Sequence, residues 1–331
     1  MFRYRTIFPV NFPIAVSYRV RGFVTLSVNM KPTSSKESHI ERTAAEPRDP
    51  SLHTVVVDQV KEVNKSIRLF RLGICEGSSL KFLPGQWLDT FVPGVHKPGG
   101  FTITSSPSMA MLPSSAYLEL AVQDSPSNPA AAWLWGHPVD NNDAGHSHSS
   151  ENEPAQLRVR VGGSFVWPPQ SIGLAPIRRV VFIAGGVGIN PLMSILSHLA
   201  EGGGSPYNVQ FLYSTKTLAE GLESGKILFL ERLAAIYGRE KVRGQLKLFL
   251  TDMRETPWSS ETVLPCNEVE VPFKKRRMML EDVAEALGPK EGHGSVVVYI
   301  CGVPTMTDEF VGKLTHGLGL KRDQVLCEKW W

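Results

Sequence analysis

The residues of this chain whose spacing most clearly suggests chemistry are Gly185, Gly186 and Gly188, followed by Pro191. They come directly after the apolar run 180–183, which is typical of a parallel strand buried on both faces. The glycines let the backbone turn sharply and keep Cβ atoms away from anything that rests on the turn. Pro191 is tolerated in a first helical turn, so a helix is predicted to start here. The N–H groups at a helix start are suited to holding a phosphate. For these glycines alone, an ordinary strand-to-helix turn is an equally good interpretation.

The elements that position this turn lie in the C-terminal half of the chain, from residue 176 onward. Apolar strands are expected at 180–185, 208–214, 246–252 and 296–302, and helices at 191–199, 227–238, 281–288 and 306–319. Strands that alternate with helices predict an α/β doubly wound parallel sheet. Ligands of such sheets bind beyond the carboxyl ends of the strands. We therefore expect the glycine turn and Cys301-Gly302 to face one crevice.

The preceding part of the chain has a different pattern of short strands separated by Gly, Pro and Ser. These strands are expected at 53–60, 65–74, 84–92, 100–106, 116–124 and 155–161. Such a series predicts an antiparallel β-barrel. The polar insertion 136–154 contains His137, His146 and His148, for which a flexible surface loop is favoured over a metal site. No metal is predicted.

The charges are unevenly distributed along the chain. The first 36 residues carry six basic and no acidic residues, so the remainder has 29 basic and 32 acidic residues despite a net charge of +3. This distribution argues against a nucleic-acid-binding body. An arginine-bearing, acid-free N-terminus predicts a mitochondrial transit peptide, with a leader that carries no address as the alternative. The polar stretch 31–52 is interpreted as a linker, and no segment has the roughly twenty apolar residues of a transmembrane helix.

The four cysteines, Cys75, Cys266, Cys301 and Cys327, are scattered without a close pair. Zinc ribbons and iron–sulfur clusters need several thiolates at short spacing, so neither is predicted. A disulfide scaffold is equally disfavoured in so long a chain with an expected intracellular address.

Five short motifs, taken in order, resemble the ferredoxin-NADP reductase superfamily. They are PGQW at 84–87, FTITSSP at 101–107, AGGVGINP at 184–191, YICGVPTM at 299–306 and EKWW at 328–331. The resemblance implies a flavin-binding β-barrel at 51–172, preceded by the leader and linker at 1–50. It also implies a pyridine-nucleotide domain of the α/β type at 176–331.

The resemblance assigns FAD to the strand that contains residues 101–105. Phe101 would stack on the isoalloxazine ring, and Thr102 would lie near the flavin N5, where it would act in catalysis. Ile103, Thr104 and Ser105 complete the motif. An aromatic side chain in the barrel core is the alternative for Phe101.

Two positions depart from the family's flavin-phosphate site. The arginine that pairs with the FAD pyrophosphate falls on Gly99, and the second phosphate contact falls on residues 128–131. Asn128 and Ala130 are therefore the candidates for that contact. A helix with Ser127 or Asn128 as its N-cap is predicted at 129–135, and its first N–H groups would hold the phosphates. We expect FAD to be bound, but weakly.

In the pyridine-nucleotide domain, the resemblance assigns the dinucleotide to the glycine turn and to a neighbouring strand end. The assigned residues are Gly185, Gly186, Val187, Gly188, Ile189, Asn190, Pro191, Cys301 and Gly302. Cys301 would lie beside the reacting nicotinamide. At the chain end, Glu328 would form a hydrogen bond or relay a proton, and Trp330 or Trp331 would cover the flavin face. Tryptophans that simply pack on the barrel are the alternative.

The choice of coenzyme depends on the residues after the strand 246–250. Relatives that use NADPH tend to have Ser-Arg where this chain has Thr251-Asp252. Because a carboxylate favours a ribose diol over a 2′-phosphate, Asp252 predicts NADH. The basic run 274–277 is interpreted as a solvated surface, with a binding site for an acidic redox partner as the alternative.

Together the motifs predict an FAD-dependent NAD(P)H oxidoreductase of the mitochondrial matrix. It would pass a hydride to the flavin and then electrons to a protein or small-molecule acceptor outside this chain. The alternative is a nucleotide-binding protein with a degenerate site, acting as a redox sensor or an assembly factor. Gly99, which replaces the family's arginine, is the feature that supports this alternative.

Overall fold

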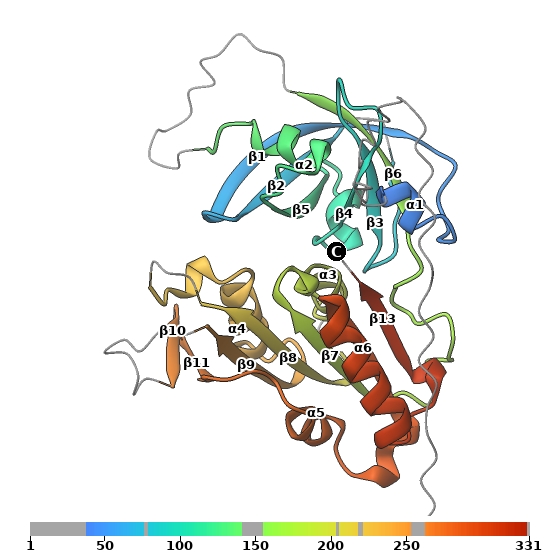
Figure 1. Cartoon of the computed structure of the whole chain (residues 1–331), viewed down its shortest axis with the longest axis vertical. Coiled ribbons are helices and arrows are strands. Elements are labelled where there is room, and N and C mark those ends of the chain that lie inside the picture. The colour runs from blue at the N-terminus through green and yellow to red at the C-terminus, as the bar shows by residue number, and fades with distance from the viewer. Residues whose placement is uncertain are drawn as a thin grey trace, which may run out of the picture. The chain divides into compact units, whose positions relative to one another are not determined.

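The computed structural model describes residues 38–75, 79–140, 155–202, 205–217, 221–252 and 262–329. Within these residues the strands form two sheets, one of six strands and one of seven (Figure 1). The leader lies outside the described residues, so mitochondrial targeting stays a prediction from the sequence. Among the described residues, no helix is both long and apolar enough to cross a membrane.

The first sheet is antiparallel and forms a barrel. Its strands are β1 (His53–Asn64), β2 (Ile67–Ile74), β3 (Trp87–Phe91), β4 (Gly99–Thr102), β5 (Tyr117–Gln123) and β6 (Gln156–Gly162). They are joined in the order β4-β3-β6-β1-β2-β5, and a bridge between Ile103 and Leu120 brings the two outer strands together. Two short helices, η1 (Pro107–Met111) and α2 (Pro129–Trp135), connect strands of this sheet.

The second sheet is mainly parallel. Its strands are β7 (Arg179–Gly185), β8 (Asn208–Lys216), β9 (Arg243–Thr251), β10 (Val263–Cys266), β11 (Val269–Lys274), β12 (Val296–Gly302) and β13 (Val325–Lys329). Their order is β10-β11-β9-β8-β7-β12-β13, and β10 and β11 form an antiparallel hairpin at one edge. After β7 the chain builds outward through β8 and β9, then returns to β12 on the other side of β7. The strand order therefore reverses between β7 and β12, and a sheet of this kind binds its ligand beyond the carboxyl ends of the strands at this switch point.

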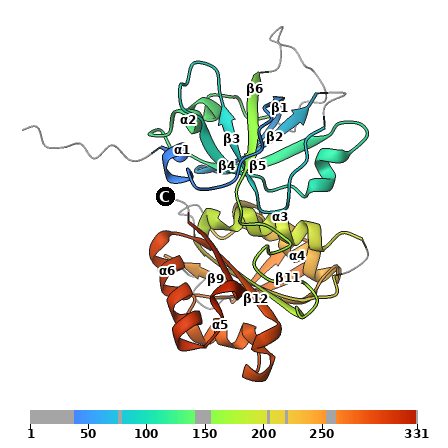
Figure 2. The ribbon, with the colours of Figure 1, turned by 90° about the vertical axis from the view of Figure 1, so that its right-hand side faces the viewer.

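Helices cover both faces of this second sheet (Figure 2). On one face, α3 (Ile189–Leu199) and α4 (Leu230–Gly238) share an apolar core with the strands. On the other face, α5 (Leu280–Leu287) and α6 (Pro304–Gly312) form a second core. Because neither face meets water, the central strands β7 and β12 are continuous apolar runs. Shorter turns are η2 (Gly186–Gly188), η3 (Ser224–Lys226), η5 (Lys290–Ser295), η6 (Lys313–Gly317) and η7 (Arg322–Gln324).

The predicted fold class, an antiparallel barrel followed by a doubly wound parallel sheet, is confirmed. The helix predicted at 129–135 is α2, and of its two predicted N-caps the side chain of Asn128 caps it. The hairpin of β10 and β11 was not predicted. It extends the sheet beyond β9 through parallel pairing of β11 with β9.

Residues 38–52 differ from the predicted linker, because part of this segment packs against the barrel. The helix α1 (His39–Arg42) places His39 in a buried position, where its Nε2 lies 2.9 Å from Oδ1 of Asp89 on β3. Arg48 Nε and Arg160 Nη2 donate to Oδ2 of the same carboxylate at 2.9 and 2.7 Å. The guanidinium of Arg48 also stacks over Trp87 at 5.0 Å. Polar composition indicated a linker, whereas these side chains are paired around one buried carboxylate.

The barrel and the second sheet contact each other through β5. Both Nη atoms of Arg232 on α4 donate to the carboxylate of Glu119 at 2.9 Å, and Thr104 Oγ1 donates to it at 2.8 Å. Asn190 Nδ2 donates to the carbonyl of Ala121 at 3.0 Å. Burial would raise the pKa of Glu119, but the hydrogen bonds and charge of Arg232 hold it below its ordinary value. A two-bond ion pair therefore fixes α4 against β5.

Replacing Asp89 with asparagine should lower the free energy of unfolding by about 3 to 5 kcal/mol, because it leaves Arg48 and Arg160 without their partner in a buried site. Chemical denaturation at neutral pH measures this change. Asp58→Asn is the matched control, because Asp58 is half exposed and paired with Arg71. The control should change stability by less than about 0.5 kcal/mol. Equal losses in the two variants would contradict the role of Asp89.

Asp89 should also make stability depend on pH. Burial would raise its pKa, but hydrogen bonds from His39, Arg160 and Arg48 lower it from 3.8 to about 2. Because the pKa is lower in the folded protein, the carboxylate contributes about 2 kcal/mol above roughly pH 4 and loses this contribution as the pH falls toward 2. Asp89→Asn should therefore lose less stability than the unmodified chain over that acid range.

Candidate functional site

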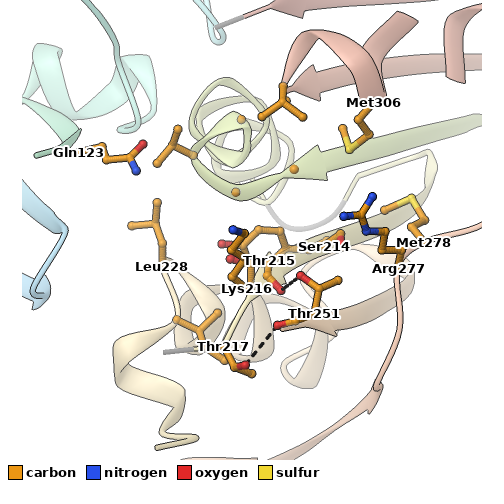
Figure 3. A pocket seen from close by; sticks show the side chains of 18 of the residues that line it. Gln123, Ser214, Thr215, Lys216, Thr217, Leu228, Thr251, Arg277, Met278 and Met306 are labelled. Carbon is orange, nitrogen blue, oxygen red and sulfur yellow. Dashed lines mark hydrogen bonds between the residues drawn. The ribbon is translucent and has the colours of Figure 1, made fainter. Parts of the chain in front are cut away.

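A cavity of about 690 Å³ lies at the carboxyl ends of the central parallel strands. The last residues of β7, β8, β9 and β12 line it, namely Gly185, Lys216, Thr251 and Gly302. Figure 3 shows Gln123 and Leu228 on one side of the cavity and Arg277 and Met306 on the other. The cavity therefore occupies the place where a doubly wound sheet binds a ligand.

The glycine turn forms one wall of this cavity. Gly186 has a φ of +55°, and a side chain added there would meet open space. A Cβ at Gly188 would lie 2.3 Å from the carbonyl oxygen of Cys301, so the backbones of η2 and β12 approach too closely for any other residue. No side chain caps α3 at Gly188, and the positive end of the helix dipole favours an anion there. This geometry favours an anion site over an ordinary turn.

Three basic residues, Lys216, Lys226 and Arg277, line the cavity together with the acidic Glu309, and none of them was predicted from the sequence to bind a nucleotide. Lys216 is the last residue of β8. Arg277 belongs to the basic run 274–277, and its guanidinium is directed into the cavity (Figure 3). The basic side chains give the cavity positive charge in addition to the backbone N–H groups of the turn. Such a lining suits a ligand with several phosphate charges.

The rest of the basic run fixes the loop that carries Arg277. Lys274 Nζ donates to the carboxylate of Asp282 at 2.8 Å, and Arg276 donates to it at 2.6 and 2.8 Å. Burial would raise the pKa of Asp282, but these hydrogen bonds and that from Met279 N–H hold it far below its ordinary value. Arg276 Nη1 also donates to the carbonyl of Arg277 at 2.9 Å. The run is therefore an ordered cluster beside α5 that remains partly exposed at the surface.

The barrel supplies the opposite wall of the cavity. Asn64, Ser66, Ile67 and Gln123 line it from the turn between β1 and β2 and from the end of β5. Asn64 Nδ2 donates to the carbonyl of Lys226 at 2.9 Å, which ties this turn to the segment before α4. The sequence carried no signal for these residues, because they join the cavity only when the two halves of the chain pack together.

Part of the predicted nucleotide set lies at the cavity. Gly185, Gly186, Val187, Gly188 and Gly302 line it. Ile189, Asn190 and Pro191 do not, because they are buried in the first turn of α3. The side-chain amide of Asn190 instead holds the barrel strand β5 through its bond to Ala121.

Asp252 does not line the cavity. Its side chain is 71% exposed, and its Oδ2 lies 4.0 Å from Nζ of Lys216. The preference for NADH that was predicted from Asp252 requires this carboxylate to face the ribose. In the structure it stands outside the lining, beside a cation that offsets its charge.

Cys301 and Glu328, two of the residues predicted for hydride transfer, are not among the residues that line the cavity. Cys301 is fully buried between β7 and β13, and burial raises the pKa of its thiol well above the ordinary value. Glu328 is the partner of Cys301 in the register of β12 and β13. Trp330 and Trp331 lie outside the described residues, so their predicted position over a flavin stays a prediction.

The strand predicted to hold FAD is buried. Phe101 is 8% exposed and belongs to the apolar cluster inside the barrel, the alternative interpretation for this residue. Thr102, Ile103, Thr104 and Ser105 are also buried. Thr104 donates to the carboxylate of Glu119, and Ser105 Oγ accepts from the N–H of Glu119 at 3.1 Å. The side chains of Thr104 and Ser105 are therefore engaged within the protein.

The predicted phosphate site of FAD is filled as well. A Cβ at Gly99 would lie 2.7 Å from Cβ of Ala130 and 2.7 Å from the ring of Phe101. The side chain of Asn128 accepts from the N–H groups of Ala130 and Ala131 at 3.2 and 3.3 Å. These are the N–H groups that were expected to hold the phosphates. Between β4 and α2 there is no room for even one additional carbon atom beside Gly99.

Within the described ranges, no group of three His, Cys, Asp or Glu side chains is arranged to hold a metal ion. His137 lies beside the ring of Trp133, with ring centroids 4.4 Å apart. His146 and His148 lie outside the described residues.

Replacing Gly188 with alanine should lower the free energy of unfolding by about 2 to 3 kcal/mol and weaken nucleotide binding, because the new Cβ forces η2 away from β12. Thermal unfolding and nucleotide titration measure the two effects. Gly312→Ala is the control, since a Cβ there would meet open space at the end of α6. If both variants show the same stability and the same nucleotide affinity, the close approach at Gly188 has no such role.

Comparison with known proteins identifies relatives along nearly the whole chain, although no protein-family model matches it. The chain is 31% identical over 323 residues to the Bos taurus protein named oxidoreductase NAD-binding domain-containing protein 1, covering 93% of this chain and 90% of that protein. The Homo sapiens protein of the same name is 30% identical over 326 residues, covering 93% and 89%.

Solved structures share the fold at lower identity. A ferredoxin NADP+ reductase from Neisseria gonorrhoeae, with bound FAD and NADP, matches 86% of this chain and all of its own at 16% identity and a TM-score of 0.57. The ferredoxin reductase of carbazole 1,9a-dioxygenase matches 85% of this chain and 70% of its own at 18% identity and a TM-score of 0.55. The chain therefore has the ferredoxin-NADP reductase fold and belongs to the family of oxidoreductase NAD-binding domain-containing protein 1.

Proposed function

We propose that this chain is a nicotinamide-nucleotide-dependent oxidoreductase that binds NADH or NADPH in the cavity at the carboxyl ends of β7, β8, β9 and β12. One observation carries the proposal. The glycine turn at the start of α3 opens into a cavity at the switch point of the sheet, and Gly186 meets open space there. The family name of the relatives, which describes an NAD-binding domain, supports the same assignment.

The residues present fit a dinucleotide in this cavity. Backbone N–H groups of η2 and the start of α3 would hold the diphosphate, as helix starts hold anions. Lys216 and Arg277 would add charge-assisted contacts to phosphate groups. Gly302 and Met306 line the cavity beside Gly185, where they would limit the access of water to the ligand. When bound, the reduced nicotinamide supplies a hydride.

FAD is the hydride acceptor that the resemblance implies, and a solved structure of this fold contains bound FAD. The residues of this chain do not fit that group as they lie. Phe101 is packed inward, and the space beside Gly99 is occupied by Ala130. The proposed hydride transfer therefore involves no flavin in the barrel.

The filled flavin position favours a second candidate function. A chain that binds a nicotinamide nucleotide without passing its hydride onward would act as a redox sensor or an assembly factor. This candidate shares the nucleotide cavity with the first. The two candidates differ only in whether the bound nucleotide passes its hydride to an acceptor.

Titration calorimetry of the full chain should show one saturable site for a reduced nicotinamide nucleotide. Anaerobic absorbance at the nicotinamide band, recorded with a quinone such as menadione, which accepts the hydride together with one proton, then measures oxidation. Binding with oxidation above the rate without protein supports the oxidoreductase. Binding without such oxidation supports the sensor or assembly factor. Both candidates fail if neither NADH nor NADPH binds.

Arg277 and Asp252 should act in opposite directions on the choice of coenzyme. A hydrogen bond to a charged group contributes about 1.5 to 3 kcal/mol, so Arg277→Gln should weaken NADPH binding about tenfold or more. NADH, which lacks the 2′-phosphate, should be affected far less. Asp252→Asn should strengthen NADPH binding, because it removes a negative charge beside Lys216.

Measured dissociation constants for both coenzymes test this pair of variants. Lys290→Gln is the control, since Lys290 is exposed in η5 and does not line the cavity. If Arg277→Gln weakens NADH and NADPH equally, Arg277 serves the shared diphosphate, and coenzyme selectivity has another origin.

A further inference from the structure

We propose that the barrel of this chain holds no resident flavin, because the chain's own side chains close β4 on both faces where the family places FAD. The inner face is closed by Phe101 and α2. The outer face is closed by the N-terminal segment 38–48. This inference is independent of nucleotide binding in the α/β domain, which uses other residues.

The inner face of β4 is a packed core. Phe101 pairs with Leu88 across β3 and β4, so the two side chains point to the same side of the sheet. Leu88 is fully buried, and Phe101 lies with it in the barrel's apolar cluster. Only 8% of Phe101 is exposed, so little of its ring is accessible. It therefore presents no free face for stacking against an isoalloxazine ring.

The helix α2 lies directly against this core. In its first turn Ala130 and Ala131 are buried at 1% exposure whereas Pro129 is exposed, and Cβ of Ala130 would be 2.7 Å from a Cβ at Gly99. A real pair of carbon atoms is never that close, so an arginine at 99 would require α2 to move. A diphosphate between β4 and α2 would require a larger displacement. Moving α2 would also open the contact of Leu134 with the barrel core.

The donors at the start of α2 are already bonded. Asn128 Oδ1 accepts from the N–H groups of Ala130 and Ala131. A phosphate at this position would have to displace the asparagine side chain and break two hydrogen bonds. With glycine at 99, no charged side chain from that position offsets the loss. The seven-residue α2 therefore behaves as a capped structural helix.

The outer face of β4 is covered by a residue from the N-terminal segment. A Cβ at Gly100 would lie 2.1 Å from the imidazole of His39, so the absence of a side chain at 100 makes the notch that His39 occupies. The imidazole is held there by Asp89 at 2.9 Å and by an edge contact with Trp87, with ring centroids 4.7 Å apart. Gly99 and Gly100 thus serve two close contacts, one on each face of the strand.

These contacts give β4 a structural role. Its two glycines let α2 approach from one side and His39 from the other, and its neighbours Thr104 and Ser105 bond to Glu119 at the contact with α4. The sequence motif that resembles a flavin site is therefore used to join the N-terminal segment, the barrel and the α/β domain.

Flavin content of the full chain tests the proposal directly. The protein should be purified without added flavin, its absorbance recorded, and the supernatant analysed for FAD after denaturation. It should then be titrated with FAD up to the concentration at which the preferred nicotinamide nucleotide saturates its own site. We expect no flavin in the supernatant and no saturable FAD binding. Stoichiometric FAD, or saturable binding in that range, overturns the inference while leaving the nucleotide cavity untouched.

Gly99→Arg restores the arginine of the family and gives a second test. If β4 and α2 are closed as described, the variant should unfold at a lower temperature and gain no affinity for FAD. Gly173→Arg adds the same charge where a Cβ meets open space, and it should leave the unfolding temperature unchanged. A Gly99→Arg protein that binds FAD with unchanged thermal stability contradicts the proposal. If this variant is insoluble, the flavin content of the unmodified chain decides.

Discussion

The close approach of the Gly188 backbone to the carbonyl of Cys301 is the constraint on which the candidate site depends. It holds the start of α3 against the end of β12, across the point where the strand order of the sheet reverses. A glycine is needed because any Cβ would overlap a backbone carbonyl rather than a side chain that could move aside. With these two segments fixed, the helix dipole, the open space at Gly186 and the cations of Lys216 and Arg277 face one cavity.

The barrel contributes to this cavity as a wall and as a clamp. Its turn between β1 and β2 and the end of β5 complete the lining, and the ion pair of Glu119 with Arg232 holds α4 against β5. Because this partly buried pair is joined by two hydrogen bonds, separating the two sheets would leave an unpaired charge on each side. The nucleotide cavity is therefore a property of the packed chain rather than of the α/β half alone.

In the same barrel, side chains that match a flavin motif in sequence contact other residues of the protein. Phe101, Thr104 and Ser105 stand in the order of a flavin motif, yet one packs inward and two bond to Glu119. The neighbouring glycines at 99 and 100 allow α2 and His39 to close on the strand. Around Asp89, three side chains that are separated along the chain converge on one buried carboxylate, so the N-terminal segment is part of the barrel.

The sequence by itself determined the fold class, the helix capped by Asn128 and the glycine turn, because strand periodicity, helix caps and tight turns depend on neighbouring residues. The tertiary structure alone decided that Phe101 faces the core, since alternation along a strand does not say which face is covered. It also decided that Arg277 enters the cavity while Asp252 stays outside, and that His39 is buried. Each of these positions depends on residues distant in the chain, such as Asp282 for Arg277's loop and Asp89 for His39. The local sequence pattern does not identify such distant partners, because they meet only when the chain folds.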